Sequence, residues 1–196
     1  MVLLYSGAEK HGAIQQQPFS SLGGYVSSTA IRNNFKNGVF SDISLNDIKD
    51  KKSSCRLIVL QNTLGVEKTD VKIWIDTNPK QITPIAQYSG ALVLPSLDDH
   101  GFPIFEKIFA ETDTPFNGVF QDVEGNINKL QIESIMPNTF IGIWLKRDIN
   151  TSNTNYFNVY GDWCLDTNQM LIDAAADATH FYNNKSEAFS LKVEYS

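Results

Sequence analysis

This 196-residue chain has only two cysteines and three histidines. One disulfide is arithmetically allowed, but a disulfide framework is excluded, and no CxxC pair offers a zinc site. Cys55 stands at the head of an apolar run, where we expect a small buried thiol rather than a bridge to Cys164. The histidines, His11, His100 and His180, are not at zinc-ligand spacing. The sequence therefore nominates no metal site.

Long apolar segments are also missing. No stretch approaches the ~18 apolar residues that span a bilayer, so we expect no membrane partner. The first five residues lack the basic and long apolar regions of a secretory signal. We therefore expect the chain to be made in the cytoplasm.

Positive charge is in short supply. There are 16 basic and 22 acidic residues, the net charge is −6, and the pI is near 5.0. A chain of this sign is repelled by phosphate backbones, so we expect no nucleic-acid partner. The densest basic run, KDKK at residues 49–52 with Arg56 beyond it, is interpreted as a solvated loop.

Signatures of catalysis are absent from the sequence as well. No serine lies in a nucleophile elbow, and no glycine-rich loop follows a strand and opens a helix. The run DDHG at residues 98–101 favours a polar turn over a cation site, because the acid spacing of a calcium loop is missing. We interpret the acids at the following positions as a solvated rim, with a glycosidase-type pair as the alternative: Asp162, Asp166, Asp173 and Glu187. We therefore predict no enzyme, no cofactor, and no catalytic, cofactor-binding or metal residues.

What the chain does contain is the composition of a folded protein, with 42% hydrophobic and 11% aromatic residues. Residues 1–40 are rich in Gln, Ser and Gly and carry only scattered apolar anchors. We predict an extended N-terminal arm that lies on its own domain or on a neighbouring subunit, with a frayed terminus as the alternative.

Strand patterns dominate residues 41–196. The clearest are an apolar run at 56–62 and alternating patterns at 69–76, 128–135, 140–146 and 189–195. Further strands are predicted at 82–88, 91–94 and 116–122. Loops at 63–68 and 124–126 predict two hairpins. Apolar residues at helical spacing predict a helix over 168–183, within an insertion at about 162–186. Together these patterns predict one mainly-β domain, a β-sandwich or jelly roll of antiparallel sheets.

The tryptophans, Trp74, Trp144 and Trp163, raise the question of carbohydrate binding, because sugars stack on exposed aromatic rings. Trp74 is the best candidate, since it falls on the face opposite Val71, Ile73 and Ile75. Large aromatic residues are also enriched in subunit interfaces, and we favour that role.

Ordered blocks over most of the chain resemble a family of small virion structural proteins of tailed bacteriophages. The blocks are LYSG at 4–7, SLGG at 21–24, SSTAI at 27–31, VFSDIS at 39–44, CRLIVLQNT at 55–63, VKIWI at 71–75, IGIWLKR at 141–147 and FSLKVE at 189–194. Two segments, residues 11–19 and 162–186, depart from the family's pattern.

The resemblance implies a non-enzymatic virion component, a repeated β-sandwich subunit that links neighbours in the tail, baseplate or fibre-attachment region. Its partners would be other copies of itself and neighbouring virion proteins. A capsid decoration or head protein is one alternative. A carbohydrate-binding module used in host adsorption, with a host glycan as ligand, is the other.

Overall fold

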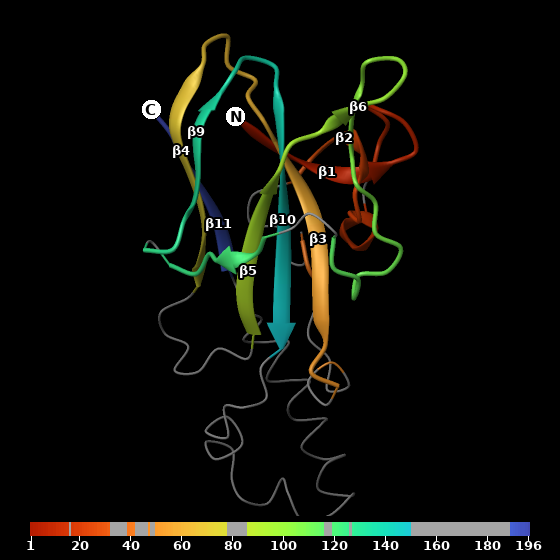
Figure 1. Cartoon of the computed structure of the whole chain (residues 1–196), viewed down its shortest axis with the longest axis vertical. Coiled ribbons are helices and arrows are strands. Elements are labelled where there is room, and N and C mark those ends of the chain that lie inside the picture. The colour runs from red at the N-terminus through yellow and green to blue at the C-terminus, as the bar shows by residue number, and fades with distance from the viewer. Residues whose placement is uncertain are drawn as a thin grey trace, which may run out of the picture.

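The structure is a computed structural model that describes residues 1–15, 17–31, 39–41, 47, 50–77, 86–115, 119–125, 127–149 and 189–196. The described chain is mainly β, with one short 3-10 helix, η1 (Pro18–Ser20) (Figure 1). Its strands are β1 (Val2–Ala8), β2 (Gly24–Ala30), β3 (Ser53–Gln61), β4 (Lys68–Thr77), β5 (Ala86–Val93), β6 (Ser96–Leu97), β7 (Pro103–Phe105), β8 (Gln121–Asp122), β9 (Leu130–Ile135), β10 (Phe140–Ile149) and β11 (Phe189–Glu194).

The described strands form two sheets, and all pairs within them are antiparallel. The larger sheet has the order β6-β7-β2-β1-β3-β10-β5-β8, and the smaller one has the order β11-β4-β9. In Figure 1 the long strands β3, β10 and β5 run down the middle, with β4, β9 and β11 on one side of them and β1, β2 and β6 on the other. The mainly-β, antiparallel fold class is thereby confirmed.

One hydrophobic core joins the two sheets. Alternate residues of β4 point into it, and Val71, Ile73 and Ile75 are at most 1% exposed. The large sheet contributes Ile58 and Leu60 from β3 together with apolar residues of β5 and β10. Burial of one such side chain stabilises the folded state by roughly 1.5–3 kcal/mol. Because many side chains of both sheets are buried together in this core, it is the main attachment of the small sheet to the large one.

A second core covers the opposite face of the large sheet. Leu57 and Val59 of β3 and Trp144 of β10 pack there with Val26 and Phe105. β3 and β10 are therefore buried on both faces, which is why their sequences are near-continuous apolar runs. The strand predicted at 140–146 is confirmed, and both of its faces are covered.

The N-terminal segment forms β1 and β2 inside the large sheet, where an extended arm was expected. β1 pairs with β2 on one side and with β3 on the other. Buried serines act beside the buried apolar residues Leu4 and Val26: the Ser6 hydroxyl donates to the Leu57 carbonyl at 2.9 Å, and the Ser21 hydroxyl donates to the Ser6 carbonyl at 3.3 Å. Over these ranges the segment lies on its own domain. A contact with a neighbouring subunit stays a prediction.

Both predicted hairpins are wrong. β3 belongs to the large sheet and β4 to the small one, so the 63–68 loop crosses between sheets. Likewise β8 pairs with β5, whereas β9 pairs with β4. The turn chemistry itself was identified correctly, because Gly125 adopts a φ of 73°. A turn sequence fixes where the chain reverses, but tertiary packing decides which strands pair.

The separation of the predicted strands at 82–88 and 91–94 is also wrong, since β5 runs without a break through Ser89 and Gly90. A Cβ on Gly90 would lie 3.0 Å from side-chain atoms of Leu130 and Val123, so the glycine marks a close approach of packed elements rather than a turn. The predicted helix at 168–183 and the insertion at 162–186 lie outside the described residues.

Candidate functional site

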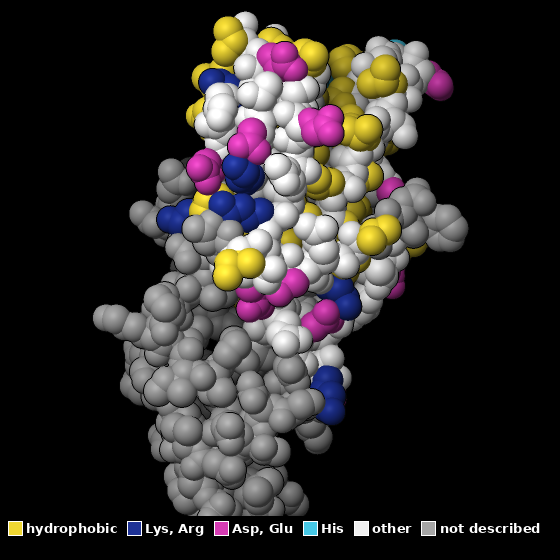
Figure 2. Space-filling model, turned by 60° about the vertical axis from the view of Figure 1, so that its left-hand side comes forward, with side chains coloured by type: hydrophobic (Ala, Val, Ile, Leu, Met, Phe, Trp, Pro, Cys, Tyr) yellow, Lys and Arg dark blue, Asp and Glu magenta, His cyan; other side chains and the backbone are white. Residues whose placement is uncertain are grey.

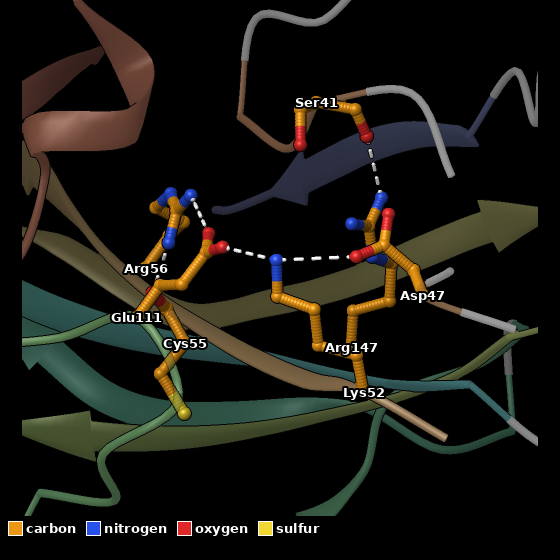
Figure 3. A network of polar contacts seen from close by, with 7 residues as sticks. All are labelled: Ser41, Asp47, Lys52, Cys55, Arg56, Glu111 and Arg147. Atoms are coloured by element: carbon orange, nitrogen blue, oxygen red, sulfur yellow. Dashed lines mark hydrogen bonds and ion pairs between the residues drawn. The ribbon is translucent and has the colours of Figure 1, made fainter. Parts of the chain in front are cut away.

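A cluster of charged side chains lies where β3 and β10 run past the common core (Figure 3). We call it the arginine cluster, and it consists of Asp47, Lys52, Arg56, Glu111 and Arg147. Arg56 of β3 and Arg147 of β10 are only 1% and 4% exposed. Buried charged groups are rare unless they are paired, so this is the most unusual chemistry in the described chain.

The strands themselves place the two arginines. In β3, Arg56 shares a face with the core residues Ile58 and Leu60, because successive side chains alternate between faces. In β10, Arg147 shares the same face with Leu145, which pairs directly with Arg56. Both guanidinium groups therefore extend from the apolar face that the small sheet covers.

Arg56 belongs to a continuous chain of ion pairs. Its Nη2 donates to Glu111, and its Nη1 donates to the Cys55 carbonyl at 2.8 Å. Glu111 also pairs with the Lys52 ammonium at 2.6 Å, and Lys52 pairs in turn with Asp47 at 3.2 Å. A backbone hydrogen bond from Cys55 to the Glu111 carbonyl, 2.6 Å long, fixes the Glu111 loop at the edge of β3.

These contacts set the ionisation of Glu111. Burial opposes the charged form, but hydrogen bonds from Lys52 and Arg56 outweigh it and hold the Glu111 pKa below its usual value. The same carboxylate raises the pKa of Lys52, mainly through the hydrogen bond between them. Both shifts favour the charged forms of Glu111 and Lys52, as the pairing requires.

Arg147 is held differently. Its Nη1 donates to the Ser41 carbonyl at 2.7 Å, and its guanidinium carbon lies 4.9 Å from the centre of the Phe40 ring. The Arg56 guanidinium lies 5.9 Å from the same ring. Within the described ranges Arg147 forms no ion pair with a carboxylate. Arg147 is thus a buried cation whose described partners are a backbone carbonyl and an aromatic ring.

Sequence reasoning missed this cluster, although a signal was present. Arg56 was assigned to a solvated basic run, but it alternates with Ile58 and Leu60, which predicts an inward side chain. Arg147 continues the alternation of Ile143 and Leu145 in the same way. The run at 49–52 is partly as expected, because Lys51 is exposed whereas Lys52 is engaged by two carboxylates.

Trp74 lies on the outer face of β4, as predicted, and is half-buried. The Lys129 ammonium sits 4.5 Å from the centre of its ring and pairs with Glu194 at 3.6 Å. Figure 2 brings this side of the molecule forward and shows acidic and basic side chains next to each other on it. A cation on the ring occupies a face on which a sugar would stack. Trp144, in contrast, is buried in the second core.

Residues 98–101 form a polar turn between β6 and β7, as predicted. The Asp98 carboxylate accepts hydrogen bonds from the backbone N–H groups of His100 and Phe102 and from the Tyr25 hydroxyl. These bonds, the one from Phe102 first, lower the pKa of Asp98. The carboxylate is thus satisfied by its own turn. His11 stacks on the Phe102 ring with 5.0 Å between ring centres.

Cys55 is a free, buried thiol, as predicted, and burial raises its pKa to about 11. Within the described ranges no group of three or more His, Cys, Asp or Glu could hold a metal ion. No helix in the same ranges is long and apolar enough to cross a membrane. The remaining residues weighed from the sequence lie outside the described ranges: Asp162, Trp163, Cys164, Asp166, Asp173, His180 and Glu187.

The two guanidinium groups of this cluster are suited to hydrogen bonds with negatively charged groups. Guanidinium groups donate hydrogen bonds and neutralise acids, but they provide neither a nucleophile nor a proton acceptor. Comparison of the chain with protein-family models, with curated proteins and with solved structures finds no match.

Proposed function

We propose that this protein is a non-enzymatic structural subunit of a tailed-phage virion, repeated in the tail, baseplate or fibre-attachment region. We also propose that its two sheets form a β-sandwich, which the core shared by both sheets supports. The single observation that carries the functional proposal is the ordered series of blocks that resembles small virion proteins.

Most of these blocks fall on strands. The block at 55–63 covers most of β3, the block at 71–75 lies in β4, the block at 141–147 lies in β10, and the block at 189–194 is β11. The first three of these strands contribute fully buried side chains to the common core. The resemblance therefore concerns the framework of the domain, which is what a mechanical subunit must preserve.

A repeated subunit also needs a surface that binds its neighbours. β6 is one of the two edge strands of the large sheet, at the opposite end from β8, and exposed apolar residues lie in it and next to it in the sequence. Leu94, Leu97 and Phe102 are 75%, 69% and 46% exposed. Clusters of exposed apolar residues are typical of protein contacts, and we propose this patch, the β6 patch, as a contact between copies.

Capsid decoration would use the same kind of contact and remains the alternative location in the particle. Carbohydrate binding at Trp74 is less well supported, because the Lys129 ammonium lies over the ring and is itself held by Glu194.

Sedimentation velocity over a range of protein concentrations tests the β6 patch. The unmodified chain should self-associate, and the double substitution Leu94→Ser with Leu97→Ser should shift association to higher concentration. Ile127→Ser is the matched control, because Ile127 is 95% exposed and lies outside the patch. Equal association of the patch variant and the control would refute the patch, and a wild-type chain that stays monomeric throughout would refute self-association.

A further inference from the structure

Three buried polar atoms without a hydrogen-bond partner belong to residues that are neighbours in the β3–β10 ladder. They are the Ser54 hydroxyl oxygen, the Arg56 Nε and the Arg147 Nε. Among the described residues only one other buried side-chain polar atom, the His11 Nδ1, lacks a partner. Buried polar groups are almost always satisfied, so such a concentration calls for a physical explanation.

The strand register places these residues together. Ser54 pairs directly with Arg147 across the β3–β10 ladder, and Arg56 is two residues from Ser54 on the same strand. Directly opposed residues on one face have Cβ atoms about 5 Å apart, and residues two positions apart share a face. Ser54, Arg56 and Arg147 therefore extend from neighbouring positions on one face of the sheet.

All three unpartnered atoms can donate a hydrogen bond. Both Nε atoms are donors only, and the Ser54 hydroxyl can donate as well. Among the described residues, the arginine cluster contains three cations, Lys52, Arg56 and Arg147, against the two carboxylates of Asp47 and Glu111, which is one positive charge more. The chain as a whole carries a net charge of −6, so this local surplus runs against the charge of the molecule.

We propose that Ser54, Arg56 and Arg147 form a binding site for a small oxyanion of the phosphate or sulfate class. The oxygens of such an ion can accept hydrogen bonds from the Ser54 hydroxyl and from the two Nε–H groups, and its negative charge offsets the additional positive charge of the cluster. The Phe40 ring, beside both guanidinium groups, limits their access to water. Because all three side chains are at least 96% buried, a free inorganic ion suits the site better than a phosphoryl group on a large ligand. The inference does not depend on the virion proposal.

Thermal unfolding of the full chain in increasing inorganic phosphate tests the site, with sodium chloride keeping the ionic strength constant. A ligand that binds only the folded state raises the unfolding midpoint with its concentration. The wild-type midpoint should rise and approach saturation, and sulfate should act similarly. Ser54→Ala should weaken the apparent phosphate affinity about tenfold, as expected for loss of one hydrogen bond to a charged group. Arg147→Gln should abolish the phosphate-dependent rise.

Lys107→Gln is the control, because it removes one positive charge from an exposed position outside the cluster. It should retain the full rise. Ser54→Ala keeps the experiment decisive if Arg147→Gln fails to fold, since loss of an unpartnered hydroxyl leaves the packing intact. Equal rises in wild type, Ser54→Ala and Lys107→Gln would show general salting-out and overturn the proposal. A wild-type midpoint that does not respond to phosphate would also overturn it and leave buried water as the partner of these donors.

Discussion

Replacing Asn62 by alanine tests how the chain is held where it leaves the large sheet for the small one. Asn62 directly follows β3 and is fully buried. Its Nδ2 donates to the carbonyls of Val66 and Ile135, at 2.9 and 2.8 Å, and its Oδ1 accepts from the Leu64 N–H at 3.0 Å. One side chain thereby joins the end of β3, the crossing loop and the end of β9.

The magnitude follows from these three hydrogen bonds. Each contributes about 1 kcal/mol net, and leaving the Ile135 carbonyl buried without a donor costs about 1–3 kcal/mol more. Water can replace part of the loss at Val66 and Leu64, which lie in a partly exposed loop. We therefore expect Asn62→Ala to lower the free energy of unfolding by about 2–4 kcal/mol, a large part of the roughly 5–15 kcal/mol typical of a domain.

Urea unfolding followed by tryptophan fluorescence, to which buried Trp144 contributes, measures this change. With a slope of about 2 kcal/mol/M, the midpoint should fall by about 1–2 M. Asn128→Ala is the matched control, because its amide donates one hydrogen bond to Asp122 on the surface. We expect that variant to lose less than about 0.5 kcal/mol.

Asn62→Asp sharpens the experiment. It keeps the acceptor for Leu64 but buries a carboxylate, whose folded-state pKa burial raises above the unfolded value. Its stability relative to wild type should therefore improve as the pH falls towards about 4. If Asn62→Ala costs no more than Asn128→Ala, the side chain does not hold the crossing and the reasoning is wrong.

Three further predictions follow from the packing and the arginine cluster. Gly142→Ala should destabilise by about 1–3 kcal/mol, because its Cβ would lie 2.6 Å from a Phe105 ring carbon, while Gly65→Ala, in open space, should be neutral in urea unfolding. Glu111→Gln should lower the free energy of unfolding at pH 7. The difference in stability from wild type should vanish as the pH falls through the lowered folded-state pKa of Glu111. A stability difference that is unchanged at about pH 3 contradicts this. Deletion of residues 1–28 should abolish cooperative unfolding, since it removes β1 and most of β2. A cooperative transition of the deletion variant in circular dichroism would show instead that residues 1–28 are an arm that the domain does not need to fold.

The sequence predicted strands best where the burial of their faces was simple. Apolar and polar residues alternate in β4 and β11 because only one face of each strand packs on the core. Most residues of β10 are apolar because both of its faces are covered. β1 and β2 were missed because serines and glycines, which resemble loop residues, form buried hydrogen bonds to β3 and to each other. The local sequence pattern does not predict hydrogen bonds between segments that are far apart in the sequence.

Strand partners could not be predicted from turns. The loops after β3 and before β9 have the composition of hairpins, yet the strands that they join lie in different sheets. Pairing depends on long-range packing such as the contact of Asn62 with Ile135. The arginine cluster was within reach of the sequence, because Arg56 and Arg147 occupy inward positions of alternating strands. Its unpartnered atoms were not, because they depend on the register of β3 against β10.

The most direct test of the virion proposal is immunogold electron microscopy of intact phage particles with an antibody raised against the recombinant chain. The account predicts label at the tail or baseplate, at positions that repeat with the symmetry of the particle. Label spread over the head would place the subunit in the capsid instead. Particles that carry no label, while the antibody detects the folded chain in solution, would contradict the account.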